Sequence, residues 1–183
     1  MTSRADAWAL VTEFTKSPTL LRHMQSVEAS MRAYARIQGE DEEYWGVVGL
    51  LHDFDYEAFP DEHPHSNLRI LRERGIPEEL ALDCYSHGDT GLPRDTAVRK
   101  AIFAVDEMSG FVIACALVKP DKSLSAVEPA GVRRKMKDKA FARAVHREDL
   151  IAGAELLGVP FETHVETVRD ALKPIAGELG LQP

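Results

Sequence analysis

Hydrophobic residues recur every three or four positions along most of the chain, which is the spacing of one face of an α-helix. In the helix predicted from Pro18 to about Gln38, Ser17 can cap the first turn and Gly39 can end the last one. An alternation of apolar and polar positions, which would predict a strand, does not extend beyond about four residues. The pattern therefore predicts an all-α fold. The helices are expected over residues 5–16, 18–38, 41–52, 65–74, 77–86, 95–118, 127–137, 147–157 and 161–178.

Two of these helices are apolar enough to lie in the centre of the fold. One contains residues 45–51, WGVVGLL, and Asp41 can cap its start. The other covers residues 95–118 and is ended by Lys119-Pro120. The chain beyond this point is more polar. We therefore expect a helical core over residues 1–120 and a helical C-terminal extension over residues 121–183 that packs on it.

The composition fits one domain with a real core, because 44% of the 183 residues are hydrophobic. The net charge of −8 argues against general nucleic-acid binding, since an acidic protein repels the phosphate backbone. The sequence has neither a signal-peptide pattern nor an uninterrupted apolar stretch of membrane-spanning length, so we expect a cytoplasmic protein with no membrane contact. Cys84 and Cys115 are expected to be reduced, buried thiols.

Four residues that can bind metals interrupt these apolar patterns. His52 and Asp53 follow the apolar run, Asp106 lies inside the helix 95–118, and His23 lies beside the apolar stripe of the helix 18–38. Each has a simpler explanation on its own: a helix end that reaches water, a solvent-facing helix edge, or a hydrogen-bonded core histidine. Together they predict a metal site with open positions for water and substrate, because a buried carboxylate needs a compensating charge. Such nitrogen and oxygen ligands suit Mn, Fe, Zn, Co or Ni.

The order His23, His52-Asp53, Asp106 resembles the HD-domain superfamily of metal-dependent phosphohydrolases. The segments that carry the resemblance are RHMQSVEASMRAYA, GLLHDFDYE and FAVDEMSGF, within residues 18–118. The resemblance implies an all-α, HD-type bundle in which these four residues bind a divalent metal ion, with Mg also a candidate. It also implies hydrolysis of a small phosphate ester, such as a nucleotide, by metal-activated water, with Asp53 among the catalytic residues. Two alternatives stay open: a di-iron oxygenase of the same superfamily, and a catalytically silent domain that senses a ligand.

Further histidines lie between the doublet and Asp106. In members of the superfamily that have such histidines, they bind a second metal ion or the phosphate of the substrate, and His63 and His87 fit that pattern. His63 is slightly favoured over His65, and a surface loop is the alternative for each. Asp55 is a candidate for orienting or deprotonating the attacking water, although a solvated acidic loop is the preferred interpretation of the segment around it.

Basic residues gather in two places that could contact a phosphate. The segment 132–147 is rich in Lys and Arg, and Arg133, Lys135 or Lys137 could reach the rim of a pocket. A solvated helix face is the simpler interpretation of that segment. Arg94, in the loop after His87, is a similar candidate. His146 and His164 fall outside the resemblance and are expected on the surface.

Overall fold

The computed structural model describes residues 2–183, which form helices joined by turns and loops, with no strand in that range. The prediction of an all-α fold is confirmed. The helices are α1 (Arg4–Phe14), α2 (Pro18–Gln38), α3 (Glu42–Leu51), α4 (His65–Glu73), α5 (Glu78–Tyr85), α6 (Ala97–Leu117), α7 (Pro129–Met136), α8 (Arg147–Leu157), α9 (Phe161–Leu172), the 3₁₀ turn η1 (Lys173–Ile175) and α10 (Ala176–Leu179).

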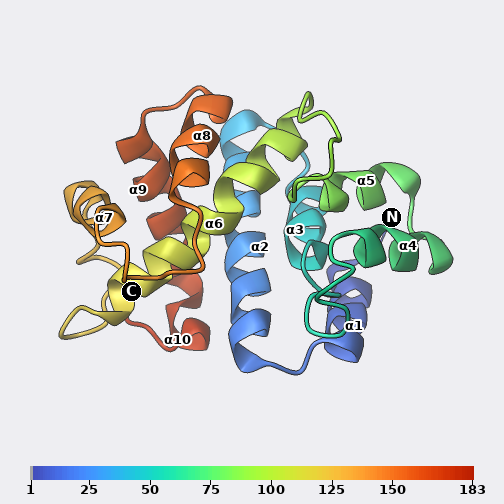
Figure 1. Ribbon diagram of the computed structural model, residues 1–183, viewed down its shortest axis with the longest axis horizontal. Helices are drawn as coiled ribbons and strands as arrows, with labels where there is room; N and C mark the ends of the chain where they lie inside the picture. Colours follow the sequence, from blue (N-terminus) through green and yellow to red (C-terminus); the bar gives the residue numbers. More distant parts are fainter. Residues whose placement is uncertain (1) are drawn as a thin grey trace.

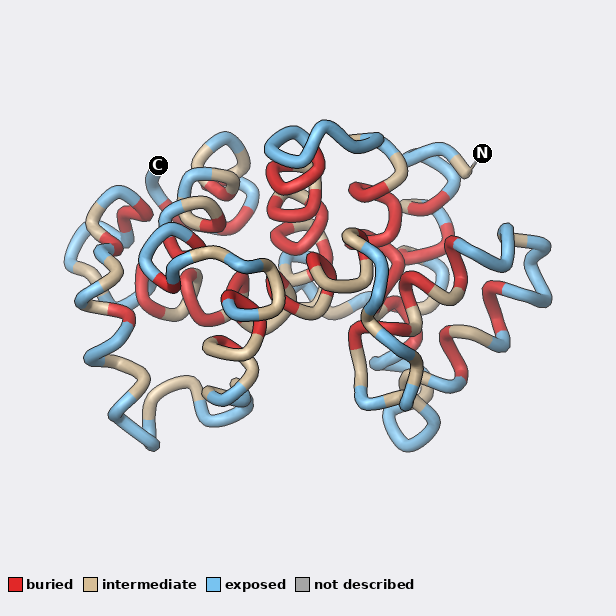
Figure 2. Tube along the Cα trace, turned by 90° about the horizontal axis from the view of Figure 1, so that it is seen from above, coloured by how far each residue is buried: buried red, intermediate tan, exposed pale blue. Residues whose placement is uncertain are grey.

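The two longest helices, α2 and α6, pack against each other in the middle of the molecule (Figure 1). The helices α1, α3, α4 and α5 lie on one side of this pair, and α7 to α10 lie on the other. The buried segments follow α2 and its neighbours, whereas the loops at both ends of the molecule are exposed (Figure 2). This arrangement follows from the sequence, because α2 and α6 are long helices that carry apolar residues toward both groups of neighbours.

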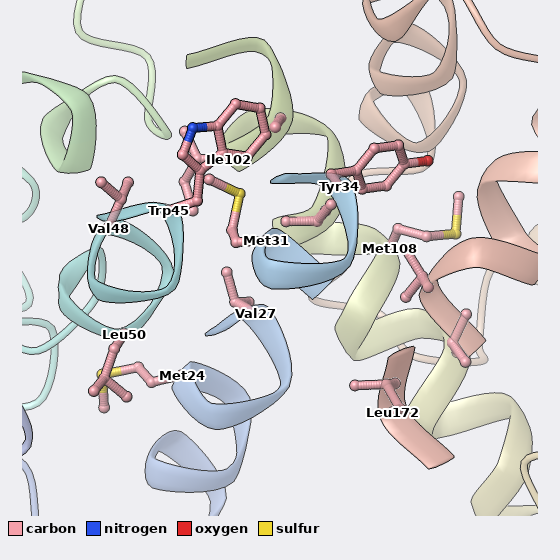
Figure 3. Close-up of a cluster of buried hydrophobic side chains, with 14 of the residues drawn as sticks. Met24, Val27, Met31, Tyr34, Trp45, Val48, Leu50, Ile102, Met108 and Leu172 are labelled. Carbon is pink, nitrogen blue, oxygen red and sulfur yellow. The ribbon is translucent and has the colours of Figure 1, made fainter. Parts of the chain in front are cut away.

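The side chains of α2 show how one helix serves two sides of the core. Met24, Val27 and Met31 are fully buried, and they lie toward α3 and its residue Leu50 (Figure 3). Tyr34, further along the same helix, lies toward α9. The apolar cluster is continuous from α1 to α10. This core runs across residue 120. The expected division into a core over residues 1–120 and an extension over residues 121–183 therefore stays a prediction.

The ends of the helices follow the capping residues. The Asp41 carboxylate accepts the backbone N–H groups of Glu43 and Tyr44 at 3.0 and 3.1 Å, as the sequence predicts for an N-cap. The last predicted helix, over residues 161–178, is wrong as one continuous element. It breaks into α9, η1 and α10, because Pro174 has no N–H and its ring excludes a regular helix at that point.

His164 is a second correction, since it is completely buried and not on the surface. Its Nε2 donates to the carbonyl of Ala104 at 2.9 Å, and its Nδ1 lies 2.6 Å from the hydroxyl of Tyr34. A carbonyl can only accept, so Nε2 carries the proton and Nδ1 accepts from the tyrosine. Burial lowers the pKa of His164 to about 4. The neutral ring therefore joins α9 to α2 and α6 inside the core.

Two sequence-based expectations about the chain as a whole can be compared with the fold. Cys84 and Cys115 are both buried and unpaired, as predicted. Within residues 2–183, none of the helices combines the length and the apolar character that crossing a bilayer requires.

Candidate metal centre

The histidines and aspartates singled out in the sequence come from five separate segments of the fold. His23 lies on α2, His52 and Asp53 follow the last turn of α3, and Asp106 lies in the middle of α6. His63 precedes α4, and His87 follows α5 by two residues. The structure brings all six side chains together, and all of them except the buried His52 line a cavity of about 800 Å³.

The position of the doublet after α3 is set by hydrogen bonds that the sequence does not reveal. The side-chain amide of Asn67 donates to the carbonyls of Leu51 and His52 at 2.8 and 2.9 Å. The hydroxyl of Thr15 donates to the carbonyl of Phe54 at 2.8 Å. These carbonyls have no partner within the helix, so two buried side chains from other helices hold the turn in place. Asn67 is one of several polar residues on an amphipathic helix, so it gives little signal in the sequence.

Gly49 controls how closely α3 approaches α2. A Cβ atom at this position would lie 3.0 Å from the backbone nitrogen and Cα of Glu28. Only glycine allows this approach without displacing a backbone, and the approach brings α3 close enough for its terminal His52 to reach His23. The Nε2 atoms of these two rings are 3.2 Å apart.

The first group of ligand atoms consists of His23, His52, Asp53 and Asp106. Nε2 of His23 lies 3.0 Å from Oδ1 of Asp106, and Nε2 of His52 lies 3.4 Å from the same oxygen. Both nitrogens lie 3.5 Å from Oδ2 of Asp53. Ligand atoms of His23, His52 and Asp53 all lie within 4.8 Å of one another, and Asp106 contacts the two histidine nitrogens of this set.

The second group of ligand atoms uses the other oxygen of the same aspartate. Oδ1 of Asp53 lies 3.3 Å from Nε2 of His63 and 3.2 Å from Nε2 of His87. These two nitrogens are 3.0 Å apart. Asp53 thus stands between two sets of histidines, with one carboxylate oxygen facing each set. An aspartate in this position could offer one oxygen to each of two cations.

Hydrogen bonds on the far side of three rings determine which nitrogen faces the centre. Nδ1 of His52 and Nδ1 of His87 lie 2.7 Å from the carbonyls of Gly49 and Cys84. Nδ1 of His63 lies 2.9 Å from Oδ1 of Asp55. Because these oxygens can only accept, each Nδ1 carries a proton and each ring turns its Nε2 toward the centre. Lone pairs that converge on carboxylate oxygens repel one another unless a cation or added protons lie between them.

The charges of His52 and of the two aspartates shift one another's pKa values, and each shift favours the ionised form. Burial alone would lower the pKa of His52, but the carboxylates of Asp53 and Asp106 outweigh burial and raise that pKa well above its usual value. Burial also opposes ionisation of the two aspartates, yet His52 keeps the pKa of each below its usual range. The carboxylates are therefore ionised at neutral pH, and the site attracts positive charge.

Asp55 does not lie in a solvated loop, so the preferred interpretation of this segment was wrong for it. Its side chain is completely buried and accepts hydrogen bonds from His63 and Ser66. Burial opposes its ionisation, but these hydrogen bonds outweigh burial and lower its pKa. Asp55 lies behind His63 and does not line the cavity, so its contact orients a ligand and does not touch an attacking water.

The two histidines around the start of α4, His63 and His65, have different surroundings. His63 faces the centre, whereas His65 is exposed and its Nδ1 lies 2.7 Å from the hydroxyl of Tyr85. Glu57, the other acid after the doublet, is exposed and accepts the backbone N–H groups of Lys16 and Ser17 before α2.

Arg94 is the only arginine or lysine on the wall of the cavity within residues 2–183. Its Nε and Nη2 donate to the carbonyls of Ser86 and Gly88 at 2.9 and 2.7 Å, and its guanidinium lies 3.9 Å from the centre of the Phe103 ring. Nη1 makes no hydrogen bond to any residue in that range. Arg94 therefore holds the loop around His87 and keeps one donor for a ligand.

The other basic residues predicted near the rim do not reach the cavity. Arg133 pairs with Glu162 at 2.6 Å, and Lys135 lies over the ring of Phe141. Neither these two residues nor Lys137 lines the cavity wall. The reason is that α7 packs against α9 and α6, which directs its basic side chains away from the ligand group.

The C-terminal part of the chain instead contributes residues that the sequence did not indicate. Ala144, His146 and Asp149 line the same cavity as Asp53 and His63. Comparison with protein-family models, with curated proteins and with solved structures finds no match to this chain. The functional argument therefore rests on the geometry of these side chains.

Proposed function

We propose that the protein is a metal-dependent phosphohydrolase that acts on a small phosphate ester. The observation that carries this proposal is the position of Asp53, whose two oxygens face two separate pairs of histidine nitrogens. The resemblance of the motif order to the HD-domain superfamily supports the same proposal. The two donor sets contain only nitrogen and oxygen, which fits Mn, Fe, Zn, Co or Ni better than a soft metal.

The residues of the first donor set, His23, His52, Asp53 and Asp106, would hold one cation, and His63, His87 and Asp53 would hold a second. Two divalent cations bound there would supply an activated water molecule and would neutralise charge on the phosphoryl oxygens. Metal binding suits His63 and His87 better than direct phosphate binding does. Nε2 of each ring faces Oδ1 of Asp53, at 3.3 and 3.2 Å, so both nitrogens are placed to share a cation with that carboxylate.

Arg94 would bind and orient the phosphate of the substrate. Its free Nη1 can donate to a phosphate oxygen, and the other two donors fix the guanidinium against the loop. The wall also carries five carboxylates, from Asp53, Asp89, Asp106, Glu107 and Asp149. A phosphate ester therefore needs the charge of the bound cations before it can enter, so catalysis and binding should both depend on metal.

The first experiment is an elemental analysis of protein purified without chelators and without a polyhistidine tag. We expect about two divalent ions at this centre in the wild type, by the count of donor sets, and none there in the double variant His52→Ala/Asp53→Ala. His63→Ala should remove the second ion only, and His65→Ala, two residues away and exposed, should retain both.

Activity then separates the proposal from its alternatives. Metal-loaded protein should release phosphate from a panel of nucleoside monophosphates and p-nitrophenyl phosphate, and Asp53→Asn should not. Two irons together with oxygen consumption would replace the proposal with a di-iron oxygenase. A metal-loaded protein that turns over neither class of substrate would replace it with a ligand-sensing domain.

A further inference from the structure

A second group of potential ligands lies on the cavity wall, away from the centre around Asp53. It consists of Glu107 on α6, His146 at the start of α8, and Asp149 in the first turn of α8. One ligand atom from each of these side chains lies within 4.8 Å of the others. Nδ1 of His146 lies 2.9 Å from Oε1 of Glu107.

Helix packing places this group, because the three residues lie on faces of α6 and α8 that touch. A Cβ atom on Gly153 of α8 would lie 2.7 Å from the Cα atom of Ala104 on α6, so the two backbones are in direct contact there. Asp149 is one turn before Gly153, and Glu107 is one turn after Ala104. The same contact that joins the helices therefore turns both carboxylates toward each other. The side-by-side course of α6 and α8 is visible in Figure 1.

Among residues 2–183, no lysine or arginine forms an ion pair with Glu107 or Asp149. The Asp149 carboxylate makes no hydrogen bond and no ion pair in that range. Arg147, next to His146, uses both Nη atoms on backbone carbonyls of the loop before α8, including those of Ala142 and Val145. Arg94 is likewise turned to the carbonyls around His87. Neither arginine forms an ion pair with this group, although Arg94 is near enough for its charge to interact with that of Asp149, and two carboxylates and an imidazole converge there.

We propose that Glu107, His146 and Asp149 bind a divalent cation that is separate from the ions of the centre around Asp53. One imidazole nitrogen and two carboxylate oxygens form a mixed set that suits Zn, Mn, Co or Ni. The side chain of His146 is 77% exposed, so water completes the coordination and the affinity is lower than at the buried centre.

The cation would connect three segments that the cavity needs. It joins α6, one residue beyond Asp106, to the start of α8 and to the loop before it, which carries Ala144 on the cavity wall. Its role is to hold the C-terminal part of the wall in place beside the ligand group. This role does not depend on which reaction the centre catalyses.

The test is a titration of the metal-free protein with Zn²⁺ and with Co²⁺. Calorimetry measures the number of ions bound and their affinity, and the absorption of bound Co²⁺ measures binding independently. Wild-type protein should bind one ion more than Asp149→Ala or His146→Ala. Glu148→Ala is the matched control, since Glu148 is exposed, is adjacent to Asp149 and lies in the same helical turn. It should bind as many ions as the wild type.

A second background makes the result independent of the first centre. In the double variant His52→Ala/Asp53→Ala we expect one ion to remain. Adding Asp149→Ala should remove this ion or lower its affinity at least tenfold. Circular dichroism confirms that each variant is folded. If wild type and Asp149→Ala bind equal numbers of ions with equal affinity, the proposal is wrong and the group is an imidazole–carboxylate pair only. If the wild type binds this ion but none at the centre around Asp53, the proposed function is wrong and this site still stands.

Discussion

Replacement of Asp55 by asparagine tests the ligand geometry most directly, because it changes a charge that lies behind a ligand. Asp55 accepts from Nδ1 of His63 at 2.9 Å inside the core, and Ser66 and Asn67 donate to the same carboxylate. Asparagine keeps the size of the side chain but offers His63 a neutral acceptor, which makes a hydrogen bond about half as strong. The imidazole becomes less basic and less firmly oriented.

The expected loss is roughly 10–100-fold in metal affinity, the usual effect of removing a carboxylate that supports a metal-binding histidine. This loss corresponds to about 1.4–2.8 kcal/mol. Because Asp55 touches His63 alone among the six ligands, the loss should be confined to the ion held with His87. The ion held by His23, His52 and Asp106 should bind as in the wild type, apart from any weakening transmitted through Asp53.

The assay is a competition titration against a chromophoric chelator that resolves two successive binding steps. Asp61→Asn is the matched control, since it makes the same chemical change at an exposed position of the same loop. Wild-type affinity for both ions in Asp55→Asn would refute the reasoning, and so would an equal loss in Asp61→Asn. Equal weakening of both steps would show that Asp55 supports the doublet as a whole and not His63.

Three further predictions concern stability and ligand binding. The pKa of His164 is about 4 in the folded protein and 6.5 in the unfolded chain. The contribution of the buried neutral ring to the free energy of unfolding is therefore fully present above pH 6.5. About 3 kcal/mol should be lost as the pH falls from 6.5 toward 4, and urea unfolding of the wild type and of His164→Gln at several pH values measures this difference. Gly49→Ala should destabilise the protein by about 1–3 kcal/mol and weaken metal binding, whereas Gly110→Ala, which has open space around its Cβ, should not. Arg94→Lys should weaken binding of inorganic phosphate to the metal-loaded protein by about tenfold or more in calorimetry, and Arg133→Lys should leave it unchanged.

Each of these predictions has a result that contradicts it. An identical pH dependence in wild type and His164→Gln would mean that the ring is not held neutral in the core. Full stability in Gly49→Ala would mean that α2 and α3 have room to separate. Equal effects at Arg94 and Arg133 would mean that phosphate is bound by general positive charge and not by the cavity wall.

The sequence alone determined the helices and the side chains that could carry chemistry. Periodicity and caps such as Asp41 depend on neighbours three or four residues away, so they can be predicted without knowing the fold. The apolar surroundings of His52-Asp53 and Asp106 marked them as residues that need a partner. His23 was the weakest of the four from its own surroundings, and the order of the motif added most to its selection.

Tertiary structure decided what each of these residues faces. The loops that carry His63 and His87 have no periodicity, so their reach depends on the packing of α4 and α5 and on hydrogen bonds such as those of Arg94. The burial of His164 depends on the carbonyl of Ala104, which is far away in the sequence. The position of Asp53 between the two groups of histidines depends on α2, α6 and the loops that carry His63 and His87. Spacing along the chain determines the faces of single helices, but only the packing of helices against one another determines which faces meet.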